Sequence, residues 1–196
     1  MKKTIFAAAC SFAVLGFFGG SVFGQVKTGS VAGAEQLKRR IIAVNTADLE
    51  AVPYDAGRAK FIATSEDTEG AFSLVELTEM PGYHTNFHRH NRTSEAFYVL
   101  EGVLSVNLNG KTADYPAGSY VLVPPGTTHA QGNRGNVPVR VLLTMTPGGF
   151  ERSFRDRAEL FRTVKPTDPD FRKKRLENAA KGNYDVEFIE NWDGQK

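Results

Sequence analysis

Three histidines and one glutamate in the middle of the chain have the residue types and spacing of a metal site. His88 and His90 lie two residues apart, so in an extended strand both imidazoles project from the same face. Glu95 follows the polar segment 91–94, and a hairpin there would bring its carboxylate back beside the two imidazoles. His129 follows a Pro-Pro-Gly turn further along the chain. Three imidazoles and one carboxylate suit a divalent transition metal such as iron, manganese, nickel, copper, cobalt or zinc. They do not suit calcium or magnesium, which prefer oxygen ligands.

Side chains near these positions predict where a small-molecule substrate would lie. Phe97 and Val99 share the strand parity of Glu95, so we expect them to line an apolar pocket beside the ion. His84 shares parity with His88 and could stand at the mouth of that pocket; a plain exposed histidine is the alternative. Strand histidines can also be surface or core residues without a ligand. Three of the chain's four histidines nevertheless fall on the expected ligand positions.

Two sequence motifs resemble those of the cupin family. The pattern G-x5-H-x-H-x4-E-x6-G matches at Gly82, His88, His90, Glu95 and Gly102. The pattern G-x5-P-x-G-x2-H-x3-N matches at Gly118, Pro124, Gly126, His129 and Asn133. The resemblance covers residues 58–148 and implies an all-β fold, the double-stranded β-helix or jelly-roll cupin barrel. It also implies that the three motif histidines and the glutamate bind one metal ion, and it favours a homodimer.

Short apolar stretches separated by turn residues predict the same all-β class without the motifs. Residues 60–64 and 71–77 are expected to pair across a polar turn. Residues 103–108 precede Asn109-Gly110, a strong two-residue hairpin signal. Residues 139–146 alternate as a further strand, and residues 41–44 are expected to form another. Residues 34–40 favour a short helix.

The pattern changes to a helical period after residue 148. Phe150, Phe154, Ala158 and Phe161 fall on one helical stripe. A second helix is expected from the Asp168-Pro169 start to Gly182, followed by a strand at 184–188. The basic run within this second helix is either a docking patch or, as we favour, a solvated helix face. We therefore assign a signal peptide at 1–24, an N-terminal extension with a strand at 25–57, the barrel at 58–148 and a helical extension at 149–196.

The first 24 residues have the order of a secretory leader. Two lysines precede an apolar stretch, and small residues around Gly24 predict cleavage there. An uncleaved membrane anchor is the alternative, but the apolar run is short for a membrane span. We expect an exported protein, periplasmic or secreted, without stable membrane insertion after cleavage. The mature chain would carry 22 basic and 22 acidic side chains and no cysteine. This balance gives no reason to expect a nucleic-acid partner.

The resemblance implies three kinds of function for the expected metal site. Similarity to quercetin-dioxygenase-like cupins implies a dioxygenase acting on a flavonol, catechol or enediol, with Glu95 as metal ligand and as proton acceptor. A sugar isomerase or epimerase is the second alternative, and a non-catalytic small-molecule-binding protein is the third. Inward-facing lysines or arginines would favour a phosphosugar. The motif strands offer only Arg89 and Arg92 nearby, and Arg89 has the wrong parity to face inward.

Overall fold

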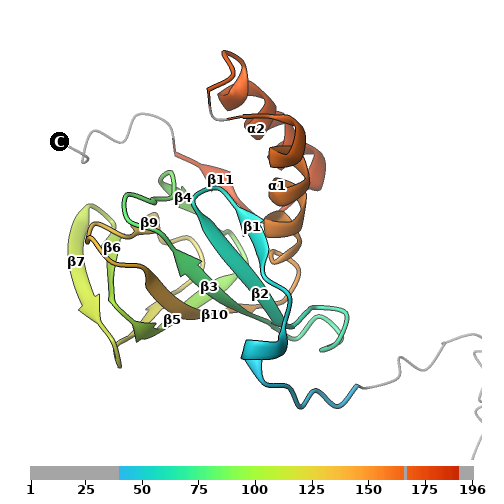
Figure 1. Ribbon diagram of the computed structural model, residues 1–196, viewed down its shortest axis with the longest axis vertical. Helices are drawn as coiled ribbons and strands as arrows, with labels where there is room; N and C mark the ends of the chain where they lie inside the picture. Colours follow the sequence, from blue (N-terminus) through green and yellow to red (C-terminus); the bar gives the residue numbers. More distant parts are fainter. Residues whose placement is uncertain (1–39, 166, 190–196) are drawn as a thin grey trace, which may run out of the picture. The chain divides into compact units, whose positions relative to one another are not determined.

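Two antiparallel sheets form the body of the protein in a computed structural model that describes residues 40–165 and 167–189 (Figure 1). Within these residues, one sheet has six strands in the order β1-β2-β3-β10-β5-β8, and the other has five in the order β11-β4-β9-β6-β7. The strands of the first sheet are β1 (Val52–Tyr54), β2 (Gly57–Ala63), β3 (Ser73–Glu79), β10 (Val139–Thr146), β5 (Ser94–Glu101) and β8 (Tyr120–Val123). Those of the second are β11 (Glu187–Phe188), β4 (His88–Arg89), β9 (His129–Gly132), β6 (Val103–Leu108) and β7 (Lys111–Pro116). This architecture confirms the predicted all-β cupin barrel with short C-terminal helices.

The hydrophobic core draws on both sheets. β10 lies between β3 and β5, and it buries every second side chain: Val139, Val141, Leu143 and Met145. β6 of the other sheet contributes Leu104 and Val106 to the same cluster. Fully burying an aliphatic side chain stabilises the fold by roughly 1.5–3 kcal/mol. The alternating pattern at 139–146 therefore favours a strand and also determines which of its faces is buried.

Turn chemistry sets the register of the hairpins. Asn109 and Gly110 join β6 to β7, and both have positive φ, at 46° and 92°. This is the conformation that a two-residue hairpin turn requires, and the sequence signal predicted it correctly. The expected pairing of residues 60–64 with 71–77 is also confirmed, because β2 pairs antiparallel with β3.

Two helices cover one part of the barrel (Figure 1). Helix α1 (Arg152–Thr163) packs against β1 and against helix α2 (Phe171–Gly182). Its inward stripe includes Phe154 and Ala158, as the helical spacing predicts. The Glu151 carboxylate accepts hydrogen bonds from Ser65 and from the backbone N–H of Gly149, and so anchors the start of α1 to the barrel. No helix in the described part of the chain is long and apolar enough to span a membrane.

Two local predictions were wrong. Residues 41–44 form no strand, and Ile41 is 93% exposed. The strand of the N-terminal extension is instead β1, which pairs with β2, whereas the apolar 41–44 run has no partner strand among the residues that the structure describes. The 91–94 segment is not a hairpin either, because it carries the chain from β4 in one sheet to β5 in the other. The leader and residues 34–39 of the expected helix lie outside the described residues, and Arg40 is not helical.

Candidate metal centre

The four expected ligands come together between the two sheets. His88 on β4 and His129 on β9 are register partners, and His90 follows directly after β4. Glu95 reaches them from β5 of the facing sheet. One potential ligand atom from each of the four residues lies within 4.8 Å of all the others, and all four side chains are buried. The structure thus holds a buried His-His-Glu-His group that could bind one metal ion.

Backbone carbonyls orient all three imidazoles. The Nδ1 atom of His88 lies 2.7 Å from Asn86 O, and that of His129 lies 2.9 Å from Thr127 O. The Nδ1 atom of His90 contacts Asp185 O. Because a carbonyl oxygen only accepts, each Nδ1 carries the hydrogen when the ring is neutral. Each Nε2 then keeps its lone pair, which is the arrangement of metal-binding histidines.

The Glu95 carboxylate shows that this donor set fits a cation. Its Oε2 atom lies 2.9 Å from His129 Nε2, and its Oε1 atom lies 3.5 Å from His90 Nε2. The lone pairs of the imidazole nitrogens and the carboxylate oxygens that they face repel each other unless a proton or a metal cation lies between them. His90 Nε2 is also buried without a hydrogen-bond partner among the described residues. Nitrogen and carboxylate donors in this number suit a first-row transition ion.

Electrostatics inside the site favour an ionised Glu95 and an uncharged His88. Burial raises the pKa of Glu95, but the facing imidazoles of His90 and His129 outweigh it, and the net pKa is well below its ordinary value. Burial, assisted by His129, lowers the pKa of His88 to about 3. For His90, burial lowers the pKa, but the Glu95 carboxylate reverses this and the net pKa is raised. An anionic Glu95 and a neutral His88 are the protonation states that metal binding needs.

A C-terminal segment completes the ligand surroundings. Strand β11 pairs with β4, where Phe188 is the register partner of His88. The Asp185 carboxylate accepts hydrogen bonds from the backbone N–H groups of the 91–93 segment at 2.8–3.0 Å and from the Thr93 hydroxyl at 2.8 Å. These donors offset the effect of burial, so the net pKa of Asp185 is lowered. Asp185 therefore holds both His90, through its carbonyl, and the connection that leads to Glu95.

Two further motif residues, Gly126 and Asn133, hold the loops around the site in place. Gly126 has φ +78° and donates its N–H to His90 O at 2.7 Å, which ties the turn before His129 to the other ligands. Asn133 donates from Nδ2 to the carbonyls of Glu79 and Val137 at 2.9 and 2.8 Å. It accepts from Gly135 N. The motif therefore specifies the loops around the site as well as the ligands.

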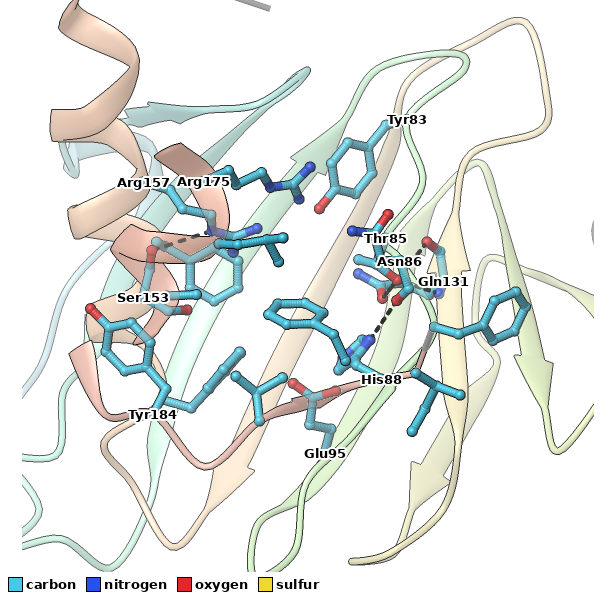
Figure 2. Close-up of a pocket in the computed structure, with 18 of the residues that line it drawn as sticks. Tyr83, Thr85, Asn86, His88, Glu95, Gln131, Ser153, Arg157, Arg175 and Tyr184 are labelled. Carbon is cyan, nitrogen blue, oxygen red and sulfur yellow. Dashed lines mark hydrogen bonds between the residues drawn. The ribbon is translucent and has the colours of Figure 1, made fainter. Parts of the chain in front are cut away.

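A cavity of about 370 Å³ opens beside the ligands (Figure 2). His88 and Glu95 line it, so the candidate metal centre is accessible to a small molecule. Its walls are rich in aromatic rings from the barrel, from both helices and from the C-terminal strand: Tyr83, Phe87, Phe150, Phe154, Phe171, Tyr184 and Phe188. Burial raises the pKa of the Tyr83 phenol, which keeps the hydroxyl protonated and able to donate.

The structure places the expected substrate-binding residues away from this lining. Phe97 and Val99 do share the inward face with Glu95, but both are fully buried in the packed core. Their side chains pack within the hydrophobic core cluster, and parity alone does not reveal such packing. His84 is exposed, and its Nδ1 lies 3.4 Å from Gly82 O. It is not among the side chains around the cavity.

Two arginines in the cavity lining were missed at the sequence level. Arg157 on α1 and Arg175 on α2 both reach the cavity from outside the motif strands. Arg89, in contrast, points away and pairs with Glu187 on β11 at 2.9–3.0 Å. Arg157 lies three residues after Phe154 on α1, so it belongs to the same helix side as the apolar stripe, and that spacing was the available signal.

Part of the chain matches a model of the cupin family. The family model described as "Cupin domain" matches residues 75–145, which include all four candidate ligands and the whole of both motifs. This match agrees with the sheet order and with the position of the buried ligand group. It leaves α1, α2 and β11 outside the family model, although these elements line the cavity.

Three curated relatives match parts of this chain. An uncharacterised protein of Methanocaldococcus jannaschii is 33% identical over 38% of this chain and 60% of its own length. The tetracenomycin polyketide synthase protein TcmJ of Streptomyces glaucescens is 34% identical over 41% of this chain and 52% of its own. Quercetin 2,3-dioxygenase of Bacillus subtilis is 27% identical over 49% of this chain and 28% of its own. The chain thus spans about half the length, or less, of two of these relatives.

Solved structures show the same fold. A predicted oxalate decarboxylase from Thermotoga maritima superposes with a TM-score of 0.51 at 18% sequence identity. The superposition covers 54% of this chain and 98% of that structure. At this identity the likeness concerns the fold alone. Because nearly all of that structure but only part of this chain is covered, the two proteins share the barrel, and this chain has a further part in addition to it.

Proposed function

We propose that this protein is a metal-dependent oxygenase acting on a small aromatic or enediol substrate, such as a flavonol or catechol. The strongest support is that the candidate metal centre and an aromatic cavity lie side by side. A buried group of three histidines and one glutamate lies at the wall of a cavity rich in aromatic side chains. Apolar walls stabilise a planar aromatic ring, and the polar end of such a substrate would face His88 and Glu95.

The four ligands would hold one divalent transition ion through Nε2 of His88, His90 and His129 and through the Glu95 carboxylate. When bound, such an ion supplies a Lewis-acidic centre with open positions for a substrate oxygen and dioxygen. The protein's own part is to position the ring between aromatic walls and to exclude water. The ionised Glu95 carboxylate carries no proton, so it is in the state that accepts one from a substrate hydroxyl.

The comparisons support this class without selecting a substrate. One relative is a quercetin 2,3-dioxygenase and another is a polyketide synthase protein, and both names indicate polycyclic or phenolic chemistry. A carboxylate that also binds a cation is a weak base, so the base role of Glu95 requires a substrate proton that is itself acidic. Phenols and enols bound at a cation meet this requirement better than sugar hydroxyls do.

The test is oxygen uptake by metal-loaded protein on a panel of flavonols and catechols, with the Glu95→Gln variant assayed beside it. Glutamine keeps the size and one carbonyl oxygen but loses the basicity. We expect the variant to retain much of its metal and to lose kcat at least a hundredfold, within the range for general-base removal. Undiminished oxygen uptake by a metal-loaded variant would exclude the base role. Absence of oxygen uptake on the whole panel would exclude the oxygenase.

A second candidate, an isomerase or epimerase of an anionic sugar, is favoured by one observation. Arg157 and Arg175 give the cavity the inward cations that the motif strands lack. The aromatic walls argue against it, because a sugar carries hydroxyls around its ring that need hydrogen-bond partners. Product analysis under anaerobic conditions separates the two, since isomerisation proceeds without dioxygen.

A further inference from the structure

Two guanidinium groups from the C-terminal helices share one carboxylate at the cavity wall. Arg157 Nη1 lies 3.1 Å from Asp55 Oδ2, and Arg175 Nη2 lies 3.4 Å from the same oxygen. The side chains of these three residues are only 12–25% exposed. Within the described part of the chain, Asp55 is the only carboxylate that pairs with either arginine. The cluster therefore carries an excess of one positive charge in a largely buried position.

Much of the hydrogen-bonding capacity of the two arginines remains open. A guanidinium has five N–H donors in a planar fork. Among the described residues, Arg157 donates two hydrogen bonds, one to Ser153 O and one to the Asp55 carboxylate. Arg175 donates one, to the same carboxylate. Arg157 is held in place by the rings of Tyr54 and Phe154, at 5.3 and 4.6 Å from their centroids. A buried cation with unused donors is unfavourable unless an anion pairs with it.

The polar atoms beside this cluster also indicate a ligand. Ser153 is 5% exposed, lines the cavity, and its hydroxyl has no hydrogen-bond partner among the described residues. Figure 2 shows the Tyr83 hydroxyl pointing toward the two guanidinium groups. It also shows these groups apart from His88 and Glu95, in another part of the same cavity. A ligand of sufficient length would contact both.

We propose that Arg157 and Arg175 form a carboxylate-binding subsite, so that the substrate is an aromatic or enediol carboxylic acid whose acidic group lies at α1 and α2. This inference rests on the proposed function and names the substrate class for it. A monoanion matches the single excess charge of the cluster, whereas a phosphate dianion would leave a negative charge uncompensated. The planar guanidinium forks also suit a carboxylate, which accepts two parallel N–H bonds.

Isothermal titration of zinc-loaded protein with 3,4-dihydroxybenzoate and with catechol tests the subsite. Zinc is redox-inactive, so binding is measured without turnover. The two probes share the diol and differ by the carboxylate. We expect the acid to bind at least tenfold tighter than catechol, as charge-assisted hydrogen bonds imply. Arg157→Gln and Arg175→Gln should each remove most of this preference and leave catechol affinity unchanged.

For Asp55→Asn we expect the opposite change, a higher affinity for the acid. A variant that had merely lost its fold would not show such a gain. This substitution removes the internal competitor for the guanidinium groups, so the acid should bind more tightly than to the native protein. Arg162→Gln is the matched control, because Arg162 lies on the same helix, is 75% exposed and pairs with Glu159. It should change neither affinity. Acetate should compete with the acid, and inorganic phosphate at equal concentration should compete no better.

Equal affinities for the two probes, or no saturable binding of the acid, would overturn the subsite. Equal weakening of both probes in the arginine variants would overturn it too. Stronger competition by phosphate than by acetate would reject a carboxylate as the group that binds. The oxygenase proposal is tested separately. If the protein prefers the acid but consumes no oxygen, the carboxylate subsite is supported and the oxygenase reaction is rejected.

Discussion

Glu79 at the end of β3 is a buried carboxylic acid that should make stability depend on pH. Its side chain is 0% exposed. Its Oε1 accepts one hydrogen bond, from Gln131 Nε2 at 3.1 Å, and its Oε2 has no partner among the described residues. Burial raises the pKa of Glu79 to about 7, and the Gln131 bond opposes this only in part. The native state therefore holds Glu79 protonated where the unfolded chain has lost the proton.

The sign follows from proton binding in the two states. The unfolded-state pKa is near 4.5 and the native pKa about 7, so folding takes up a proton between these values. The free energy of unfolding should fall as pH rises through this window and remain lower above it. A difference of roughly 2.5 pKa units corresponds to about 3 kcal/mol. Glu79→Gln keeps the group uncharged at every pH, so it should remove this loss.

Urea unfolding of the native protein and Glu79→Gln between pH 4.5 and 8, at fixed metal content, measures the effect. We expect similar stability near pH 4.5 and a variant more stable by about 3 kcal/mol near pH 8. Glu76→Gln is the control for removing a carboxylate from the same strand, because Glu76, unlike Glu79, is ion-paired, with Arg140 at 3.1 Å. A Glu79→Gln variant with the native slope, or one that is less stable at pH 8, would refute the reasoning.

Replacing any of the three motif histidines by alanine should remove most of the bound metal, whereas His84→Ala should keep it; elemental analysis of the purified variants decides. Asp185→Ala should weaken metal affinity about ten- to hundredfold, because it frees the 91–93 connection. Competition with a coloured chelator measures this, and native affinity would show that Asp185 does not position the ligands. We also expect the protein to be exported and its mature form to begin near Gln25, and N-terminal sequencing that returned Met1 would contradict cleavage of the leader.

The sequence alone was sufficient for most of the barrel and for the ligand group. Strand alternation is a local property, so residues 139–146 and the Asn109-Gly110 hairpin were predicted in place. The four candidate ligands were predicted to come together because metal chemistry restricts residue type and spacing together, and the structure does bring them together. The C-terminal helices were predicted from the 3.6-residue period of their apolar residues and their end signals.

Only the tertiary structure decided which elements surround the ligands. The connection after His90 crosses between sheets, and no local pattern distinguishes such a crossing from a hairpin. Phe97 has the right parity for a pocket but packs in the core, because the open space depends on what the other sheet and the helices fill. Arg157 and Asp55 meet across 102 residues of sequence. Contacts of this range depend on how separate elements pack, whereas periodicity and motif spacing record only what each segment does locally.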